Sequence, residues 1–291
     1  MNLSVIIPCH NAARTIGETL EGLMTQAWPG DCEILVADNG SSDELTSILQ
    51  QYHGQLPGLR RIDASGRRGP SHARNVGVRA SRGESILFCD ADDVPAPGWA
   101  MAMSKGLKTH SFVACRQEFQ KLNTPAARVA REQTQVAMLQ RFKILPYPHA
   151  GAGTLGIVRT LHEAVSGFDE SLPICEDIDY CMRVQSTGVR LEMIPDAVLH
   201  IRLRHSVREI MVQASQYAEY EVYVFKKYGK TSMREWWRWR QYAERWRPLL
   251  THMPELLRTP EGRTMFAWHL GRQMGLLKGS LRFRAAPIII E

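Results

Sequence analysis

The sequence predicts an α/β protein with a mostly parallel sheet flanked by helices and a helical extension at the C-terminus. Two observations lead to this prediction. Through about the first 200 residues, short apolar runs that suit buried strands alternate with segments of helical apolar spacing. From about Ser206 onward, only helical patterns occur. We therefore expect a domain over residues 1–205, with halves at 1–110 and 111–205, and an extension over 206–291.

The elements follow from apolar spacing and from turn residues. Ile16, Leu20 and Leu23 share one helical face, and Pro70 suits the first turn of a helix. In the first half, strands are predicted at 3–8, 33–37 and 85–89, and helices at about 12–26, 43–49 and 70–80. In the second half, strands are predicted at 112–115 and 189–194, and helices at about 126–142 and 176–187.

Composition excludes several classes of protein. Among the 291 residues, 44% are hydrophobic, which suffices for a globular core. No run approaches the roughly 18 apolar residues of a membrane span, and the start lacks the charged segment of a signal peptide, so we expect a cytoplasmic protein. The six cysteines form no C-x-x-C pair and are expected to be reduced thiols.

Positive charge is concentrated in the C-terminal extension. Residues 202–291 hold 17 Lys and Arg against 8 Asp and Glu, and five of the seven tryptophans lie there among arginines. This pattern suits an anionic surface at the inner face of the membrane or an acidic partner. The alternatives are tryptophans packed on the main domain, or a dimer contact. The extension contains no recognised nucleic-acid reader motif, and we expect no nucleic-acid partner.

Acidic residues follow the strand at 85–89. Asp90, Asp92 and Asp93 lie where a parallel strand leaves the sheet, and their mutual repulsion would be relieved by a hard divalent cation. A solvated acidic turn is the alternative. The cationic segment at 200–205 carries His200 and His205, either of which could complete the metal shell or be a surface histidine.

Other strand ends bring polar groups to the same edge of the sheet. His10 and Asp38 are expected around one crevice with the aspartates, where Asp38 could accept an imide N–H from a uracil-type base. Glu176 and Asp177 begin a helix, where a carboxylate would be ionised and positioned as a base, or would simply cap the helix. The turn after the opening strand carries no Gly-rich dinucleotide fingerprint, and the sequence contains no P-loop fingerprint.

Taken together, six segments resemble family 2 glycosyltransferases with the GT-A fold, whose sheet is Rossmann-like and mostly parallel. These segments occur in the order seen in that family: Ser4–Asn11, Val36–Asp43, Gly69–Gly77, Asp90–Asp93, Gly167–Glu170 and Glu176–Asp177.

The resemblance implies an inverting enzyme that moves a single sugar from a nucleotide-diphosphate donor, most simply a UDP-sugar. Pro8, His10, Asn11, Asp38 and Arg74 would bind the nucleotide. The acceptor could be a lipid-linked glycan, a peptide or a small glycan. An inactive nucleotide-sugar-binding or scaffold protein is the alternative.

The resemblance also assigns roles around the diphosphate. Asp90 and Ala91 would contact the donor, and Asp92 would ligate Mn²⁺ or Mg²⁺, with His205 as a candidate further ligand. Asp177 would be the general base toward the acceptor, with Glu176 orienting it.

Overall fold

The computed structural model describes residues 3–131, 134–230 and 233–287, and within them the chain forms two compact units. The first unit contains Met1–Glu118, Gln135–Gln140 and His149–Arg202, and the second contains Phe119–Thr134, Arg141–Pro148 and Leu203–Glu291. The expected boundary at residue 205 thus lies close to the end of the first unit. Two short segments before it nevertheless belong to the second.

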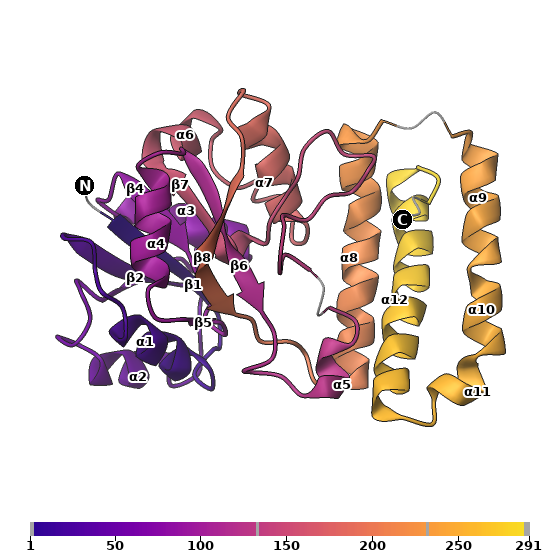
Figure 1. Cartoon of the computed structure of the whole chain (residues 1–291), viewed down its shortest axis with the longest axis horizontal. Helices are drawn as coiled ribbons and strands as arrows, with labels where there is room; N and C mark the ends of the chain where they lie inside the picture. The colour runs from indigo at the N-terminus through magenta and orange to yellow at the C-terminus, as the bar shows by residue number, and fades with distance from the viewer. Residues whose placement is uncertain (1–2, 132–133, 231–232, 288–291) are drawn as a thin grey trace. The chain divides into compact units, whose positions relative to one another are not determined.

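An eight-stranded sheet forms the centre of the first unit, in the order β3-β2-β1-β4-β7-β6-β8-β5 (Figure 1). The strands are β1 Leu3–Cys9, β2 Cys32–Asp38, β3 Arg60–Asp63, β4 Ser85–Phe88, β5 Val94–Pro95, β6 Phe112–Glu118, β7 Leu155–Val158 and β8 Glu192–His200. The helices of this unit are α1 Ile16–Met24, α2 Leu45–Gln51, α3 Pro70–Ala80, α4 Trp99–Leu107, α6 Arg159–Ala164 and α7 Glu176–Gln185, with a 3₁₀ turn, η1, at Ala152–Thr154.

The predicted mostly parallel sheet with flanking helices is confirmed. β3, β2, β1 and β4 pair in parallel, as do β6 and β8, whereas β7 runs antiparallel to β4 and β6, and β5 antiparallel to β8. Because parallel neighbours need crossover connections, α1, α2 and α3 each join two strands of the first group. The carboxyl ends of β1, β2 and β4 therefore meet at one edge, with Cys9 paired to Asp38.

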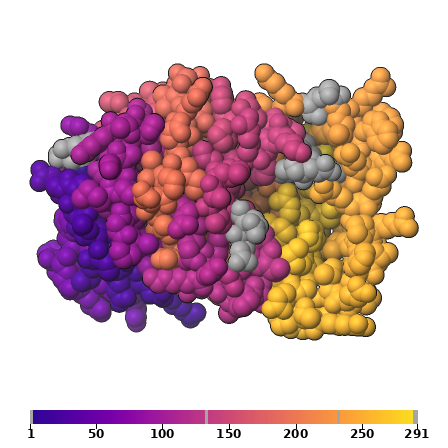
Figure 2. Space-filling model, in the orientation of Figure 1, coloured from indigo at the N-terminus to yellow at the C-terminus, as the bar shows by residue number. Residues whose placement is uncertain are grey.

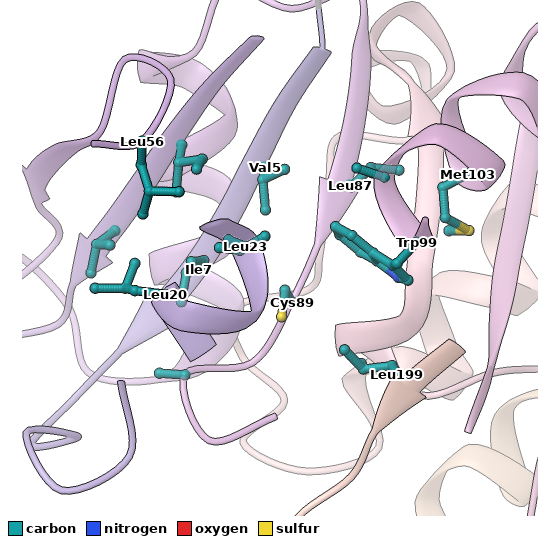
Figure 3. Packing of buried hydrophobic residues seen from close by; sticks show 14 of the residues in the cluster. Val5, Ile7, Leu20, Leu23, Leu56, Leu87, Cys89, Trp99, Met103 and Leu199 are labelled. Atoms are coloured by element: carbon teal, nitrogen blue, oxygen red, sulfur yellow. The ribbon is translucent and has the colours of Figure 1, made fainter. Parts of the chain in front are cut away.

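Alternation along β1 places its side chains in two different layers. Val5 and Ile7 pack with Leu20 and Leu23 of α1, in a cluster that also contains Trp99 and Met103 of α4 (Figure 3). The intervening Ile6 faces α3, where a Cβ added at Gly77 would lie 2.4 Å from its Cγ2. Helices therefore cover both faces of the sheet, and the glycine allows α3 to approach β1 closely.

The predicted helix over 126–142 is wrong. Only α5, Pro125–Arg128, is helical, and residues 132–133 lie outside the described part of the chain. Gln135 has φ 50° and is buried, and its amide nitrogen donates to the Cys115 carbonyl at 2.8 Å and to Thr154 Oγ1 at 2.7 Å. Hydrogen bonding to the sheet thus replaces helical hydrogen bonding at this position.

Other boundaries also differ from the prediction. β3 and α4 were not predicted. β3 lacks an apolar run, because it is a short edge strand with the polar sequence Arg-Arg-Ile-Asp. β8 begins later than predicted and continues to His200, beyond a register shift opposite Cys115 and Arg116. The shift accommodates Pro195, which cannot donate to a ladder hydrogen bond.

The second unit is helical, as predicted from Ser206 onward. Its helices are α5, α8 Val207–Tyr228, α9 Glu235–Glu244, α10 Trp246–Thr251, α11 Met253–Leu256 and α12 Pro260–Phe283. In Figure 1, α12 runs between α8 and the α9–α10 segment. Within the described residues, no helix combines the length and apolar character needed to cross a bilayer.

Small residues bring α8 and α12 close together. A Cβ added at Gly271, Gly275 or Gly279 would lie 2.3, 2.1 or 2.4 Å from a carbonyl oxygen of α8. Acidic side chains of α8 are neutralised by α12 across this contact: Glu221 pairs with Arg272 at 2.7 Å, and Glu219 pairs with Lys278 at 2.8 Å and Arg282 at 2.7 Å.

We predict that Gly275→Ala lowers the free energy of unfolding of the second unit by about 1–3 kcal/mol, because the new methyl group meets backbone and not a flexible side chain. Gly17→Ala in α1 is the matched control, since its Cβ would lie an ordinary 3.5 Å from Tyr52 Oη. Thermal and urea unfolding measure both. Equal destabilisation by the two variants would contradict the close contact.

Candidate functional site

Asp38 ends β2 in a buried position, where both of its carboxylate oxygens accept hydrogen bonds. Its Oδ1 accepts from the Ser41 backbone N–H at 2.8 Å, and its Oδ2 accepts from Arg61 Nε at 2.8 Å. Burial opposes ionisation, but the hydrogen bonds from Ser41 and the Arg61 guanidinium outweigh it and hold the pKa of Asp38 below its usual value. The side chain lies at the predicted edge of the sheet, where Arg61 of β3 already engages it.

The turn after β1 is fastened to the turn after β2. Asn11 has φ 51°, its backbone N–H donates to Ser41 Oγ at 2.9 Å, and its Oδ1 accepts from the Ser42 N–H at 2.8 Å. Pro8 is paired with Ala37 in the sheet, and His10 is exposed next to Asn11. These hydrogen bonds fix the backbone around the residues expected to bind a nucleotide.

Arg74 is the buried cation of the site. Its side chain is 4% exposed; Nη1 donates to Glu176 Oε1 at 2.8 Å and Nη2 donates to Asp90 Oδ1 at 2.7 Å. Burial disfavours the charged form, but the carboxylates of Asp90 and Glu176 raise the pKa of Arg74 above its usual value. The guanidinium also lies 5.4 Å from the ring centre of Phe168. α3 thereby joins the strand end after β4 to the start of α7.

The acidic segment after β4 concentrates negative charge. Asp93 is buried, and burial together with the charges of Asp92 and Asp90 raises its pKa well above the usual value, although the Arg202 backbone N–H donates to its Oδ1 at 2.9 Å. Opposite Asp90, a Cβ at Gly153 would lie 2.7 Å from the carboxyl carbon, so this glycine permits the close packing.

The carboxylate oxygens of this segment suit Mn²⁺ or Mg²⁺, which prefer hard oxygen ligands. Across the described ranges, no group of three or more His, Cys, Asp or Glu side chains is arranged to hold a metal ion. One or two carboxylates plus phosphate oxygens are the usual Mg²⁺ ligands, so Asp92 fits a metal that arrives with a diphosphate. His200 contacts Glu118 at 2.6 Å, and His205 is an exposed residue of the second unit.

Glu176 and Asp177 open α7 but do not cap it. The N-cap is Cys175, in a left-handed conformation with φ 60° and no side-chain cap. Densely packed surroundings, and then the charge of Glu176, raise the pKa of Asp177 to about 7, although its Oδ1 accepts from the Ile178 N–H at 2.8 Å. The expectation of a carboxylate stabilised in its ionised form is therefore corrected: Asp177 titrates near neutrality, a value that suits a general base.

The loop before α7 is held by side chains that sequence reasoning did not assign. Asn75 Nδ2 donates to the Phe168 carbonyl and to Glu170 Oε1, both at 2.9 Å, and its Oδ1 accepts from the Phe168 N–H at 2.9 Å. His72 contacts Glu170 at 2.8 Å. Asn75 immediately follows Arg74, so one turn of α3 holds both this loop and the acidic residues. In the sequence, the only indication of a role for these residues was their place within the segments 69–77 and 167–170, which resemble family 2 glycosyltransferases.

Comparison with known proteins identifies the family. The model of glycosyl transferase family 2 matches residues 4–158, and the chain belongs to this family. It is 28% identical over 202 residues to the glycosyltransferase AglE of Haloferax volcanii, covering 67% of this chain and 65% of AglE. It is 37% identical over 97 residues to a poly(ribitol-phosphate) beta-glucosyltransferase of Bacillus spizizenii, covering 32% of this chain and 15% of that protein. The matched segments thus span less than two thirds of these relatives.

Solved structures share the fold. The mannosyltransferase PcManGT of Pyrobaculum calidifontis, in complex with GDP-Man and Mn²⁺, has a TM-score of 0.68 and 21% identity, covering 95% of this chain and 86% of that chain. Residues 1–349 of S. aureus TarS, in complex with UDP-GlcNAc, give a TM-score of 0.58 and 18% identity, covering 98% of this chain and 93% of that chain. The GT-A fold expected from the sequence is confirmed.

We predict that Arg74→Gln lowers the free energy of unfolding by about 3 kcal/mol, because it leaves the carboxylate of Glu176 without its buried partner. Arg240→Gln is the control, since Arg240 and Glu244 form an ion pair whose side chains are 58% and 59% exposed, and its loss should cost less than about 1 kcal/mol. Urea unfolding measures both changes. A negligible effect of Arg74→Gln would show that the buried network does not stabilise the fold.

Proposed function

We propose that the protein is an inverting glycosyltransferase that moves one sugar from a nucleotide-diphosphate donor, most simply a UDP-sugar, to an acceptor nucleophile. The observation that carries the proposal is the double ion pair of Arg74, which links a carboxylate suited to the donor with the acidic start of α7. Solved structures with this fold are complexed with UDP-GlcNAc or with GDP-Man and Mn²⁺, which supports a nucleotide-sugar donor.

The donor would lie against the edge formed by β1, β2 and β4, within residues 1–110. The base of the nucleotide would be contacted by Pro8, His10, Asn11 and Asp38. Arg61 would also lie beside the base, because it donates a hydrogen bond to Asp38. Asp90 and Ala91 would meet the ribose or diphosphate side. The exposed edge of Asp90, whose side chain is 36% exposed beside a nearly buried Arg74, supports that assignment.

A divalent cation bound by Asp92 would neutralise the departing diphosphate. The chain itself holds Asp90, Asp92 and Asp93 close together. Burial and the repulsion among these carboxylates raise the pKa of Asp93, and a bound cation would relieve that repulsion. Gly153 packs closely against Asp90, so any side chain in its place would displace this carboxylate.

Asp177 would take the proton from the acceptor nucleophile, opposite the departing diphosphate, so that a single displacement inverts the anomeric carbon. Glu176, held by Arg74, would fix the orientation of the α7 start. The acceptor, whether a lipid-linked glycan, a peptide or a small glycan, would bind in the half at 111–205. An inactive nucleotide-sugar-binding protein is the second candidate, favoured only if donor binding occurs without turnover.

The first test is a thermal-shift panel of UDP- and GDP-sugars with and without Mn²⁺ or Mg²⁺. We expect one donor to raise the Tm only when metal is present, and Asp92→Ala to abolish that shift while the unfolding of the free protein stays cooperative. Asp196→Asn, at an exposed carboxylate of β8, is the control and should keep the shift. Metal-independent stabilisation by the same donor would remove the metal assignment.

The second test concerns the base. Because Asp177 acts in its ionised form and its pKa is raised to about 7, kcat/KM should rise with pH and level off above about pH 7. Asp177→Asn should lower kcat about 10²- to 10⁴-fold while the donor Kd is kept.

Glu176→Gln removes a negative charge that raises the pKa of Asp177, so the rising limb should move to lower pH. An unchanged limb in Glu176→Gln, together with full turnover in Asp177→Asn, would exclude Asp177 as the base.

A further inference from the structure

Within the described residues of the second unit, the side chains of α9 and α10 that pack inward share one face. Tyr242 is buried among Ala218, Val222 and Leu276, and its hydroxyl donates to the Gln273 carbonyl at 3.0 Å. Arg238 lies on the same side, where its Nε donates to the Pro287 carbonyl at 3.2 Å. The inner face of the α9–α10 segment is therefore fixed against α12 and the residues that follow it.

The side of the segment next to this inner face carries exposed apolar side chains, and one of them, Trp239, contacts Tyr242 edge-on with ring centres 5.8 Å apart. Trp236, Trp239, Ala243 and Leu250 are spaced i, i+3, i+7 and i+14, which places them along one side of the nearly continuous α9–α10 segment. Trp236, Trp239 and Leu250 are 53%, 39% and 59% exposed. In Figure 2, side chains of this orange region stand out from the surface of the second unit. We call these four residues the tryptophan stripe.

Cations flank the tryptophan stripe. Arg240 and Arg247 follow Trp236 and Ala243 by four residues each, so they lie beside the stripe, and both are exposed. The Arg240 guanidinium lies 4.8 Å from the ring centre of Trp237, which itself stacks on Trp236 at 4.5 Å. Residues 234–258 hold six arginines against three glutamates, so the surplus charge is positive.

The acids of the unit do not balance this charge. Glu219 and Glu221 are buried and already neutralised by Lys278, Arg282 and Arg272 across the α8–α12 contact. Among the described residues, Glu244 forms the ion pair with Arg240, and both of these side chains remain more than half exposed. The positive charges beside the tryptophan stripe are therefore exposed to solvent.

We propose that the tryptophan stripe and its flanking arginines bind an anionic lipid surface, with α9 and α10 lying in the plane of the interface. Exposed tryptophans beside arginines on one face of a helix combine apolar burial at the headgroup level with attraction to acidic lipids. A nucleic acid would be attracted by the arginines but offers no apolar layer for Leu250, and a second copy of this chain would bring equal positive charge against them. The proposal does not depend on the glycosyl transfer proposed above.

The test is co-sedimentation of the full chain with vesicles, without any nucleotide sugar. Binding to phosphatidylcholine vesicles that contain phosphatidylglycerol should exceed binding to pure phosphatidylcholine by at least about tenfold and should fall with added salt. The combined change Arg240→Gln and Arg247→Gln should weaken binding about 25-fold, from about fivefold per arginine. Trp236→Ser with Trp239→Ser should weaken it at least about tenfold.

Matched controls lie in the first unit. Lys105→Gln with Lys108→Gln removes two exposed cations at the C-terminal end of α4, and Met138→Ser removes an apolar side chain that is 74% exposed; neither should change binding by more than about twofold. Circular dichroism and thermal unfolding check that the stripe variants are folded. Equal binding to neutral and anionic vesicles, or full binding by both stripe variants, would overturn the proposal. So would a lipid-independent dimer lost in the tryptophan variant, or binding to a DNA oligonucleotide without binding to vesicles.

Discussion

The arrangement of the site depends on a single buried guanidinium. Arg74 is almost inaccessible to solvent and donates to one carboxylate at the end of β4 and to another at the start of α7. A buried cation is tolerated only when its charge and hydrogen bonds are compensated, so its two partners are constrained together. Segments that lie far apart along the chain are thereby held at one edge of the sheet, and the loop bound by the adjacent Asn75 is held with them.

Electrostatics divides the carboxyl groups of this edge into different roles. Asp38 is kept ionised by Arg61 and Ser41, whereas burial and neighbouring negative charge raise the pKa of Asp93 and Asp177. Asp38 therefore stays a charged hydrogen-bond acceptor. The ionisation of Asp93 and Asp177, by contrast, depends on pH and on nearby charge. Such a separation of pKa values within one site is typical of proteins that must both bind a charged group and move a proton.

In the second unit, buried carboxylates are paired with cations to stabilise helix packing. Its buried glutamates are paired with cations of α12 along a seam of glycines, so α8 and α12 form a close, internally neutral pair. Tyr242 and Arg238 attach α9 to the rest of the unit, whereas Trp236, Trp237 and Trp239 remain exposed. This separation between an internally satisfied pair and an outward-facing apolar and basic stripe is what distinguishes the unit from an ordinary helical appendage.

The sequence by itself determined the alternation of strands and helices, the edge at which Asp38 and Asp90 lie, and the helical nature of the extension, because apolar periodicity and strand-end position are local properties of the chain. It did not determine β3, α4 or the irregular course around Gln135, where polar edge residues and hydrogen bonds to distant strands override local preference. Nor could it give the pairing of Arg61 with Asp38, the Arg74 bridge or the raised pKa of Asp177. These depend on distances and burial between residues far apart in the chain, which only the tertiary structure decides.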